Sequence, residues 1–443
     1  MKKIRMQCLT VGLGCLLAVS AGSCSSTSAS SKLLVAPAKA ETLLYAERMQ
    51  ESFCAFRNTV REFSAEFAAA AYEQQTTNEN FVVSPVSVYM ALALAAECSA
   101  GETQTELLNT LGVSYAELTE NIGKLYRLLQ RSTELETNGS ERMSKKILQT
   151  SNSVWLGAEA EAKQDCLEAL ANGQYCYSYE ADFVDQNAAA NEAVREVVKE
   201  QTDGIIDRDF QINDETVFVL LNTLYLTDNW LKDGGDLALT KMEYSFMQTD
   251  GQTKLIKLVK SMYEAGNCYE TETFTSFFAA TGNNMKLKFL LPKEGYTVRE
   301  IFTAENIQAA NKAEYKSIDF EKKLKYYTRC FFPEFQASCD KDVKGILRER
   351  FGVQQMFSLE NANFSRISDY KPLFCERIQH VADLKVDRKG IQGAAVTSVI
   401  LPGAAGPDDY TKVYHDLIMD KPFAFLITDF SDMPLFMGGV NDN

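Results

Sequence analysis

Residues 80–112, "NFVVSPVSVYMALALAAECSAGETQTELLNTLG", limit the possible folds most strongly. A short strand leads into Ser84 and Pro85, a helix cap followed by proline at the first helical position. The predicted helix that follows is apolar on nearly all sides, so other elements must surround it. A second helix is predicted from near Thr103, with Gly112 as its left-handed cap. The chain therefore needs a core large enough to enclose a helix.

The remaining pattern indicates one domain that mixes helices and strands. The segment 57–75 carries an apolar stripe at helical spacing, and 187–204 is a second predicted helix closed by glycine. The segment 216–226, "TVFVLLNTLYL", is β-branched and apolar throughout, which is typical of a strand covered on both faces. A further strand is predicted within 150–158. Strand patterns dominate the second half, and neither a repeat nor an interior linker divides the chain, so the predicted class is α+β.

The first residues predict export. Residues 1–23 begin with three basic residues, continue with an apolar run too short to span a membrane, and end on small residues, as a signal peptide does. The ending "SAGSC" resembles the bacterial lipoprotein cleavage box, which would make Cys24 the lipidated N-terminus; the alternative is a plain secretory signal. Residues 24–55 are interpreted as that N-terminus, a flexible spacer and a lead-in. The expected location is the outer membrane or cell surface through the lipid, or the periplasm or exterior.

Charge and cysteine content narrow the possible partners. Removing residues 1–23 takes three positive charges from a chain of net charge −15, which leaves −18. Nucleic acid is therefore not an expected partner, and a membrane is expected only through the lipid anchor. Eight cysteines remain after Cys24, scattered and without a CxxC pair, so no metal site is predicted and buried thiols are favoured for most of them. No cofactor is predicted.

Motifs of catalysis are missing from the sequence. The chain has two histidines, His380 and His415, and it contains no HExxH, GxSxG, GxGxxG or Walker pattern. A Cys–His or Ser–His pair could still meet in space, but no local motif supports one. The prediction is that the protein is not an enzyme.

The stretch 390–410, "GIQGAAVTSVILPGAAGPDDY", is uncharged up to Pro407, yet its small residues make it a poor strand. If it did form a strand, alternate residues would face one side. The residues of that side are almost all apolar or small: Ile391, Gly393, Ala395, Thr397, Val399 and Leu401. The polar residues Gln392 and Ser398 fall on the other side. No charge would enter a sheet before Pro402, where burial of an unpaired charge would cost several kcal/mol.

Seven blocks in one order resemble the serpin family. They are residues 80–112, "SNSVWL", "LLNTLYL" with Trp230, "LLPKEG", "FFPEF", "DKPFAFLI" and "PLFMGGV". The resemblance runs from about Phe56 to the C-terminus, so it implies a serpin domain over 56–443. It implies an α+β serpin fold with three β-sheets, eight or nine helices, and a reactive loop, about 388–410, that can insert into the main sheet.

The resemblance also implies roles for individual residues. Four match the polar shutter cluster beneath the main sheet, namely Ser84, Ser87, Asn222 and His380. From the residues alone, Ser84 is equally an ordinary helix cap and His380 a buried strand histidine. Trp230 matches the tryptophan of the breach, where an inserting loop first enters. The hinge would comprise Gly390, Ile391, Gln392, Gly393, Ala394, Ala395, Val396 and Thr397.

The implied activity is suicide-substrate inhibition of serine, and possibly cysteine, endopeptidases by a monomer. The family's loop length places the reactive bond between Ala404 and Ala405, with the bonds to Gly403 and Gly406 as neighbouring alternatives. Such small residues suit elastase-like or subtilisin-like proteases. The second hypothesis is a non-inhibitory serpin that binds or carries a ligand. A third, more remote, is an envelope hydrolase or solute-binding lipoprotein.

Three positions in or just before the hinge depart from the family pattern and bear on inhibitory efficiency. The family often has Thr or Ser where Ile391 stands, Ala where Gly393 stands, and an acidic residue where Arg388 stands.

Overall fold

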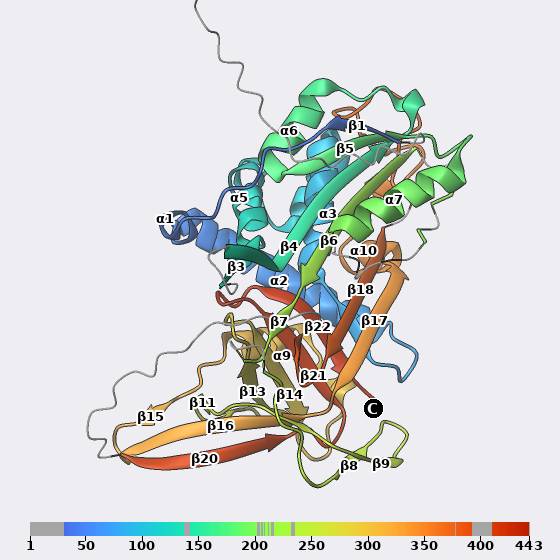
Figure 1. Ribbon diagram of the computed structural model, residues 1–443. Helices are drawn as coiled ribbons and strands as arrows, with labels where there is room; N and C mark the ends of the chain where they lie inside the picture. Colours follow the sequence, from blue (N-terminus) through green and yellow to red (C-terminus); the bar gives the residue numbers. More distant parts are fainter. Residues whose placement is uncertain are drawn as a thin grey trace, which may run out of the picture.

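The computed structural model describes residues 31–442, except for 137–141, 377, 392–409 and scattered positions between 202 and 234 (Figure 1). Within these residues lie ten α-helices: α1 (Tyr45–Arg48), α2 (Glu51–Glu73), α3 (Pro85–Cys98), α4 (Gly101–Leu111), α5 (Tyr115–Leu128), α6 (Gln164–Gln174), α7 (Asn187–Gln201), α8 (Val298–Ile301), α9 (Ala304–Lys312) and α10 (Lys344–Arg350).

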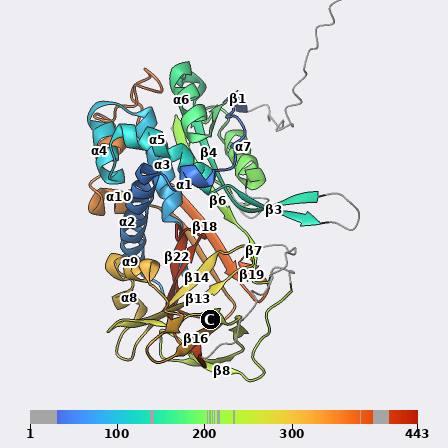
Figure 2. The same ribbon diagram turned by 90° about the vertical axis from the view of Figure 1, so that its left-hand side faces the viewer.

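The helix α3 is the interior helix that its composition predicts. Every residue from Pro85 to Cys98 is buried, and Pro85 occupies the first helical position. The next helix, α4, ends at Gly112, whose φ of 69° is the left-handed conformation that favours glycine. Figure 2 shows α2, α3, α4 and α10 gathered on one side of the strands. The helical side of the molecule is therefore built largely by its first third.

One sheet of five strands crosses the helical half of the molecule. It contains β1 (Ser31–Val35), β3 (Arg131–Glu136), β4 (Arg142–Leu156), β5 (Cys176–Ala181) and β6 (Phe218–Leu226). The helix α3 covers one face of this sheet and α7 covers the other (Figures 1 and 2). On the α7 side, Val194 and Val198 pack with Trp155 and Leu221 in a separate apolar cluster. The expectation of a strand at 216–226 covered on both faces is confirmed.

A sheet of ten strands runs through the rest of the core. Its order is β12 (Tyr269–Glu270), β13 (Phe274–Ala280), β14 (Lys286–Pro292), β21 (Phe423–Thr428), β22 (Pro434–Val440), β2 (Phe81–Val83), β17 (Phe335–Asp342), β18 (Gln379–Val386), β19 (Gly390–Ile391) and β7 (Asp228–Asn229). Because β7 continues the chain of β6 past Thr227, the two large sheets meet at this point.

Two smaller sheets lie at the end of the molecule away from α6. One contains β10 (Val259–Lys260), β11 (Glu264–Ala265), β15 (Ile318–Asp319), β16 (Leu324–Phe332) and β20 (Thr411–Ile418), and the other β8 (Tyr244–Met247) and β9 (Thr253–Ile256). Figure 1 shows β16 and β20 side by side as a long ribbon at the lower edge.

The element counts differ slightly from those that the resemblance implied. The described residues form four groups of strands rather than three and ten helices rather than eight or nine. Two of the helices, α1 and α8, have four residues each. The expected main sheet is divided, since β6 pairs with β4 whereas β18 pairs with β17 and β19. That division is part of the site described below.

The segment 31–55 differs from the expected flexible spacer. Residues Ser31–Val35 form β1, antiparallel to the outer edge of β5, and α2 begins at Glu51 rather than near residue 57. Arg127 of α5 holds the intervening chain through two hydrogen bonds to the Glu47 carboxylate, of 2.8 and 2.7 Å. The apolar run Leu33–Leu34–Val35 suffices for a strand because β5 offers it an open edge. The strand propensity of residues 31–35 cannot reveal that edge, because β5 belongs to a distant part of the chain.

All eight cysteines of the body are free, and six of them are buried, as expected for most of them. Within the described part of the chain, no helix combines the length and apolar character needed to cross a membrane.

Candidate functional site

A cleft separates β6 from β18 above the buried helix α3. Its floor is formed by Ser87, Val88 and Ala91 of α3. Its walls come from β6, β18, α7 and the segment before β6: Leu220, Leu221, Asn222, Thr223, Ile378, His380, Val381, Val198 and Phe210. The cleft thus runs between two strands whose backbone edges face each other.

Polar side chains link the start of α3 to both walls of the cleft. His380 Nε2 on β18 accepts a hydrogen bond from the backbone N–H of Ser84 at 3.1 Å. Ser87 Oγ donates to the backbone oxygen of Asn222 on β6 at 3.2 Å. Burial lowers the pKa of His380 from 6.5 to about 4, so the imidazole is neutral at pH 7 and can accept this bond. The structure therefore brings all four predicted shutter residues together.

Asn222 is held by the neighbouring strand β4. Its Nδ2 donates to Thr150 Oγ1 at 2.9 Å and to Asn152 Oδ1 at 2.8 Å. Two buried oxygen atoms of the shutter, Ser84 Oγ and Asn222 Oδ1, have no hydrogen-bond partner among the described residues. Ser84 occupies the N-cap position of α3, but its hydroxyl makes no capping bond, so the helix-cap interpretation holds only for its position. Buried polar atoms without a hydrogen-bond partner are rare in proteins, and each one calls for a physical explanation.

The first two hinge residues already lie in a sheet. Gly390 and Ile391 form β19, in which Ile391 pairs with Val386 of β18 on one side and with Asp228 of β7 on the other. Ile391 is fully buried in the main core, which agrees with its place on the core side of the alternating pattern. A Cβ on Gly390 would collide with the backbone oxygen of Asp228, so only glycine allows β19 to approach β7 this closely.

Trp230 fastens the turn that precedes the hinge. Its indole Nε1 donates to the backbone oxygen of Asp387 at 2.6 Å, and its backbone N–H donates to that of Lys389 at 3.2 Å. The indole is 4% exposed and packs on Phe332, with ring centroids 5.3 Å apart. The tryptophan therefore lies where the chain leaves β18 and enters β19.

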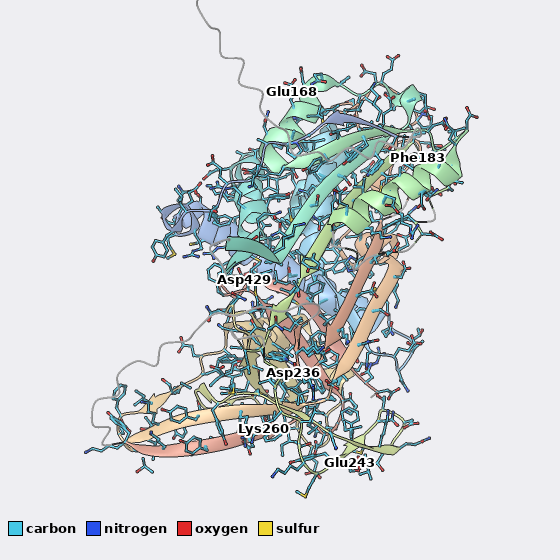
Figure 3. The ribbon with its side chains drawn as sticks, in the orientation of Figure 1. Glu168, Phe183, Asp236, Glu243, Lys260 and Asp429 are labelled. Carbon is cyan, nitrogen blue, oxygen red and sulfur yellow. The ribbon has the colours of Figure 1, made fainter. Side chains whose placement is uncertain are left out.

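Arg388 has its own partners in this turn. Its guanidinium pairs with Asp236, labelled in Figure 3, at 2.6 Å. Its backbone N–H donates to Glu334 Oε1 at 3.0 Å, and its backbone oxygen accepts from Leu237 N at 2.8 Å. The basic residue at a position where the family often has an acidic one is thus matched by two nearby carboxylates.

The residues that hold β7 against Gly390 and Ile391 were not predicted from the sequence. The Asp228 carboxylate is buried, and it accepts hydrogen bonds from Thr281 Oγ1 and from Asn283 Nδ2, the latter at 2.7 Å. Burial raises the pKa of this carboxyl group. The available signal was an aspartate two residues after the apolar strand β6 and two residues before Trp230, whereas its partners are more than 50 residues away.

Several predicted residues lie outside the described part of the chain. They are the signal peptide 1–23, Cys24, hinge residues 392–397, and Gly403, Ala404, Ala405 and Gly406. Among the residues that are described, no group of three or more His, Cys, Asp or Glu side chains is placed to hold a metal ion.

Comparison with known proteins identifies this arrangement. Residues 58–443 match the family model described as "Serpin (serine protease inhibitor)". The chain is 27% identical over 387 residues to alpha-1-antiproteinase S of Cavia porcellus, covering 85% of this chain and 89% of that protein. It is 26% identical over 420 residues to corticosteroid-binding globulin of Saimiri sciureus, covering 90% and 95% respectively.

Solved structures agree on the fold. The native-state crystal structure of tengpin, a thermophilic serpin, superposes with a TM-score of 0.71 and 22% identity, covering 94% of this chain and all of that one. The expected α+β serpin fold is therefore confirmed. With a family model matched over 58–443, this chain belongs to the serpin family.

Proposed function

We propose that this serpin is a suicide-substrate inhibitor of serine or cysteine endopeptidases. The observation that carries the proposal is the position of β19. The proposed reactive loop includes Gly390 and Ile391, and these residues are paired between β18 and β7. Their partner Val386 lies five residues along β18 from Val381, which lines the cleft. A loop cleaved farther along could therefore continue from β19 into the cleft by adding backbone pairs, without first finding its register.

The shutter supports insertion at the same place. A strand between β6 and β18 would bring backbone N–H groups beside Asn222, which lines the cleft and whose buried Oδ1 has no partner among the described residues. We assign Ser84, Ser87, Asn222 and His380 to the shutter, Trp230 to the breach and residues 390–397 to the hinge. In this proposal the four polar residues hold the two walls to α3 until the loop arrives.

The proposed chemistry is an interrupted proteolysis. The protease's nucleophilic oxygen or sulfur attacks the Ala404 carbonyl carbon, the bond to the Ala405 nitrogen breaks, and that nitrogen takes a proton from the protease's general acid. Some 15 inserted residues at about 3.3 Å each would carry the acylated protease roughly 50 Å before water releases it. The small residues at 403–406 favour elastase-like or subtilisin-like targets, with Gly403–Ala404 and Ala405–Gly406 as alternative bonds. The protein itself turns over no substrate.

Incubation with a limiting amount of pancreatic-type elastase should yield a covalent complex that survives SDS and a released peptide beginning at Ala405. Electrophoresis and N-terminal sequencing or mass spectrometry measure both products in one reaction. The same mixture is repeated with a subtilisin-like and a cysteine protease. If every protease cuts the loop and stays free and active, the inhibitor proposal fails.

A non-inhibitory binding function is the second candidate. The similarity to corticosteroid-binding globulin favours it, since that relative is named for binding a steroid. Loop cleavage without any covalent complex, together with saturable binding of a small apolar ligand, would support this alternative.

We also propose that the mature protein is a monomer tethered to the cell envelope through a lipid on Cys24. Seven chain steps lead from Cys24 to Ser31, where β1 begins, so the tether would reach at most about 25 Å. A Cys24→Ala variant should then move from the membrane fraction to the soluble fraction of the periplasm or medium and lose incorporation of labelled fatty acid. If variant and parent distribute equally between the fractions, Cys24 carries no lipid anchor and residues 1–23 act as a plain secretory signal.

A further inference from the structure

An exposed group of tyrosines covers one face of the sheet that contains β16 and β20. Tyr327 on β16 is opposite Tyr414 on β20 in the strand register, and Arg329 is opposite Asp416. Tyr263 precedes β11, whose pairing with β16 places it next to Arg329. These five residues, Tyr263, Tyr327, Arg329, Tyr414 and Asp416, are called the tyrosine patch. Four of them come from β16 and β20 and the fifth from the position before β11, and they share one face because of the two-residue period of a strand.

The tyrosine patch is held in one arrangement by its own contacts. Arg329 makes a two-pronged salt bridge to Asp416, with hydrogen bonds of 3.1 and 2.9 Å. The guanidinium carbon lies 4.4 Å from the centre of the Tyr263 ring, and Tyr263 Oη donates to Asp416 Oδ1 at 3.3 Å. Tyr414 contacts Tyr263 edge-on, with centroids 5.0 Å apart, and stacks with Tyr327 at 5.4 Å. Such fixed rings lose little conformational entropy when a partner covers them.

Two of the three rings are exposed to solvent, whereas Tyr327 is half-buried. Tyr414 is 56% exposed and Tyr263 38% exposed. Fixed aromatic rings beside an arginine have the composition of the few interface residues that carry most binding energy in protein complexes. Figure 3 shows side chains standing out along this ribbon, whose inner end is near the labelled Lys260. The internal contacts explain how the rings are held, but not why they are exposed.

The chain connection into β20 limits how far this face can lie from the proposed reactive bond. Tyr410 is the first described residue after the loop, and the next residue, Thr411, begins β20 and donates its N–H to Lys323 O at 2.9 Å. From Ala405 to Tyr414 the chain has nine steps, at most about 30 Å. A protease domain of about 230 residues has a radius of gyration near 17 Å and is therefore roughly 45 Å across. A protease bound at Ala404–Ala405 is thus wide enough to reach the tyrosine patch.

We propose that the tyrosine patch is a second contact surface for the protease held on the reactive loop. This inference rests on the proposed function, and it adds a surface that would help to select which protease is bound. The partner would be an endopeptidase whose surface next to its active-site cleft offers apolar area and hydrogen-bond acceptors for tyrosine rings and hydroxyls. Because Arg329 and Asp416 neutralise each other, this contact would depend little on salt. Selectivity among proteases would then come partly from the tyrosine patch, because the loop offers only small residues at 403–406.

The test uses the protease that forms the covalent complex. A Tyr263→Ala/Tyr414→Ala variant should lower the second-order rate constant of inhibition at least tenfold, with an unchanged inhibitor-to-protease stoichiometry and unfolding midpoint. Tyr296→Ala is the matched control, since Tyr296 is 41% exposed on the turn after β14. A peptide of residues 398–409 lacks the tyrosine patch, so the rate at which the protease cuts it measures recognition of the loop alone. The protease should attack the loop of the parent protein faster than this peptide, whereas it should attack the double variant no faster than the peptide.

The outcomes separate the two proposals. If the inhibition rate of the double variant stays within twofold of the parent rate, the patch proposal is wrong. A covalent band would still support the inhibitor function in that case. If no protease forms a covalent complex, the function fails and the patch proposal fails with it. If the parent is a dimer in size-exclusion chromatography and the double variant a monomer, the rings cover a second copy of this chain instead.

Discussion

A Thr397→Arg variant should be cut by the target protease but should no longer trap it. The alternation from Ile391 places Thr397 on the core side of an inserted strand, above a cleft floor that includes Val88 and Ala91. Burial of an unpaired guanidinium there would cost several kcal/mol, and each 1.4 kcal/mol added to the insertion barrier slows insertion about tenfold. Hydrolysis of the acyl-enzyme would then win, and we expect the number of inhibitor molecules consumed per protease to rise at least tenfold.

The measurement is the stoichiometry of inhibition, read from residual protease activity, together with the yield of covalent complex on SDS gels. An Asp409→Arg variant carries the same new side chain beyond the predicted inserted strand and should keep the parent stoichiometry. Cleavage at the parent bond, shown by the released peptide, ensures that target recognition is intact. A Thr397→Arg protein that still forms complex in full yield would show that residue 397 does not enter the sheet.

Local patterns in the sequence were sufficient for the elements that depend on local physics. The all-apolar helix α3, its start at Pro85 and the stop of α4 at Gly112 follow from side-chain pattern and glycine conformation, and the structure has all three. The shutter residues also meet as the family resemblance implied. Composition could not place them, because Ser84 and His380 are 296 positions apart and their contact depends on how β18 packs on α3.

The elements that were missed depend on partners distant in the chain. The strand β1 needs the open edge of β5, and the buried Asp228 needs Thr281 and Asn283. The position of Gly390 and Ile391 inside a sheet was not foreseen either. Their sequence indicates a weak strand, and only the pairing of β7 and β18 on either side gives that weak strand two edges.

Replacement of His380 by glutamine should change how stability depends on pH. The pKa of His380 is about 4 in the folded protein and near 6.5 when unfolded, because burial disfavours the imidazolium. Below pH 6.5 the unfolded chain therefore takes up a proton that the folded protein refuses, and stability is lost as the pH falls from 6.5 to 4. Between pH 7 and 4.5 this amounts to roughly 2–3 kcal/mol at 1.36 kcal/mol per pKa unit. His380→Gln keeps a hydrogen-bond acceptor for Ser84 N but removes this loss.

The quantity to measure is the difference in unfolding free energy between parent and variant, from denaturant titrations at pH 7 and pH 4.5. The parent curve alone would mislead, because burial raises the pKa of Glu264 to about 7, above its usual 4.5. The folded protein therefore binds a proton on Glu264 between pH 7 and 4.5, which adds stability as the pH falls and opposes His380. His380→Gln should gain relative to the parent on acidification, whereas Glu264→Gln should lose. If the His380→Gln difference is the same at both pH values, the imidazole takes up its proton as readily in the folded protein as in the unfolded chain, and the hydrogen bond from Ser84 N–H is lost on acidification.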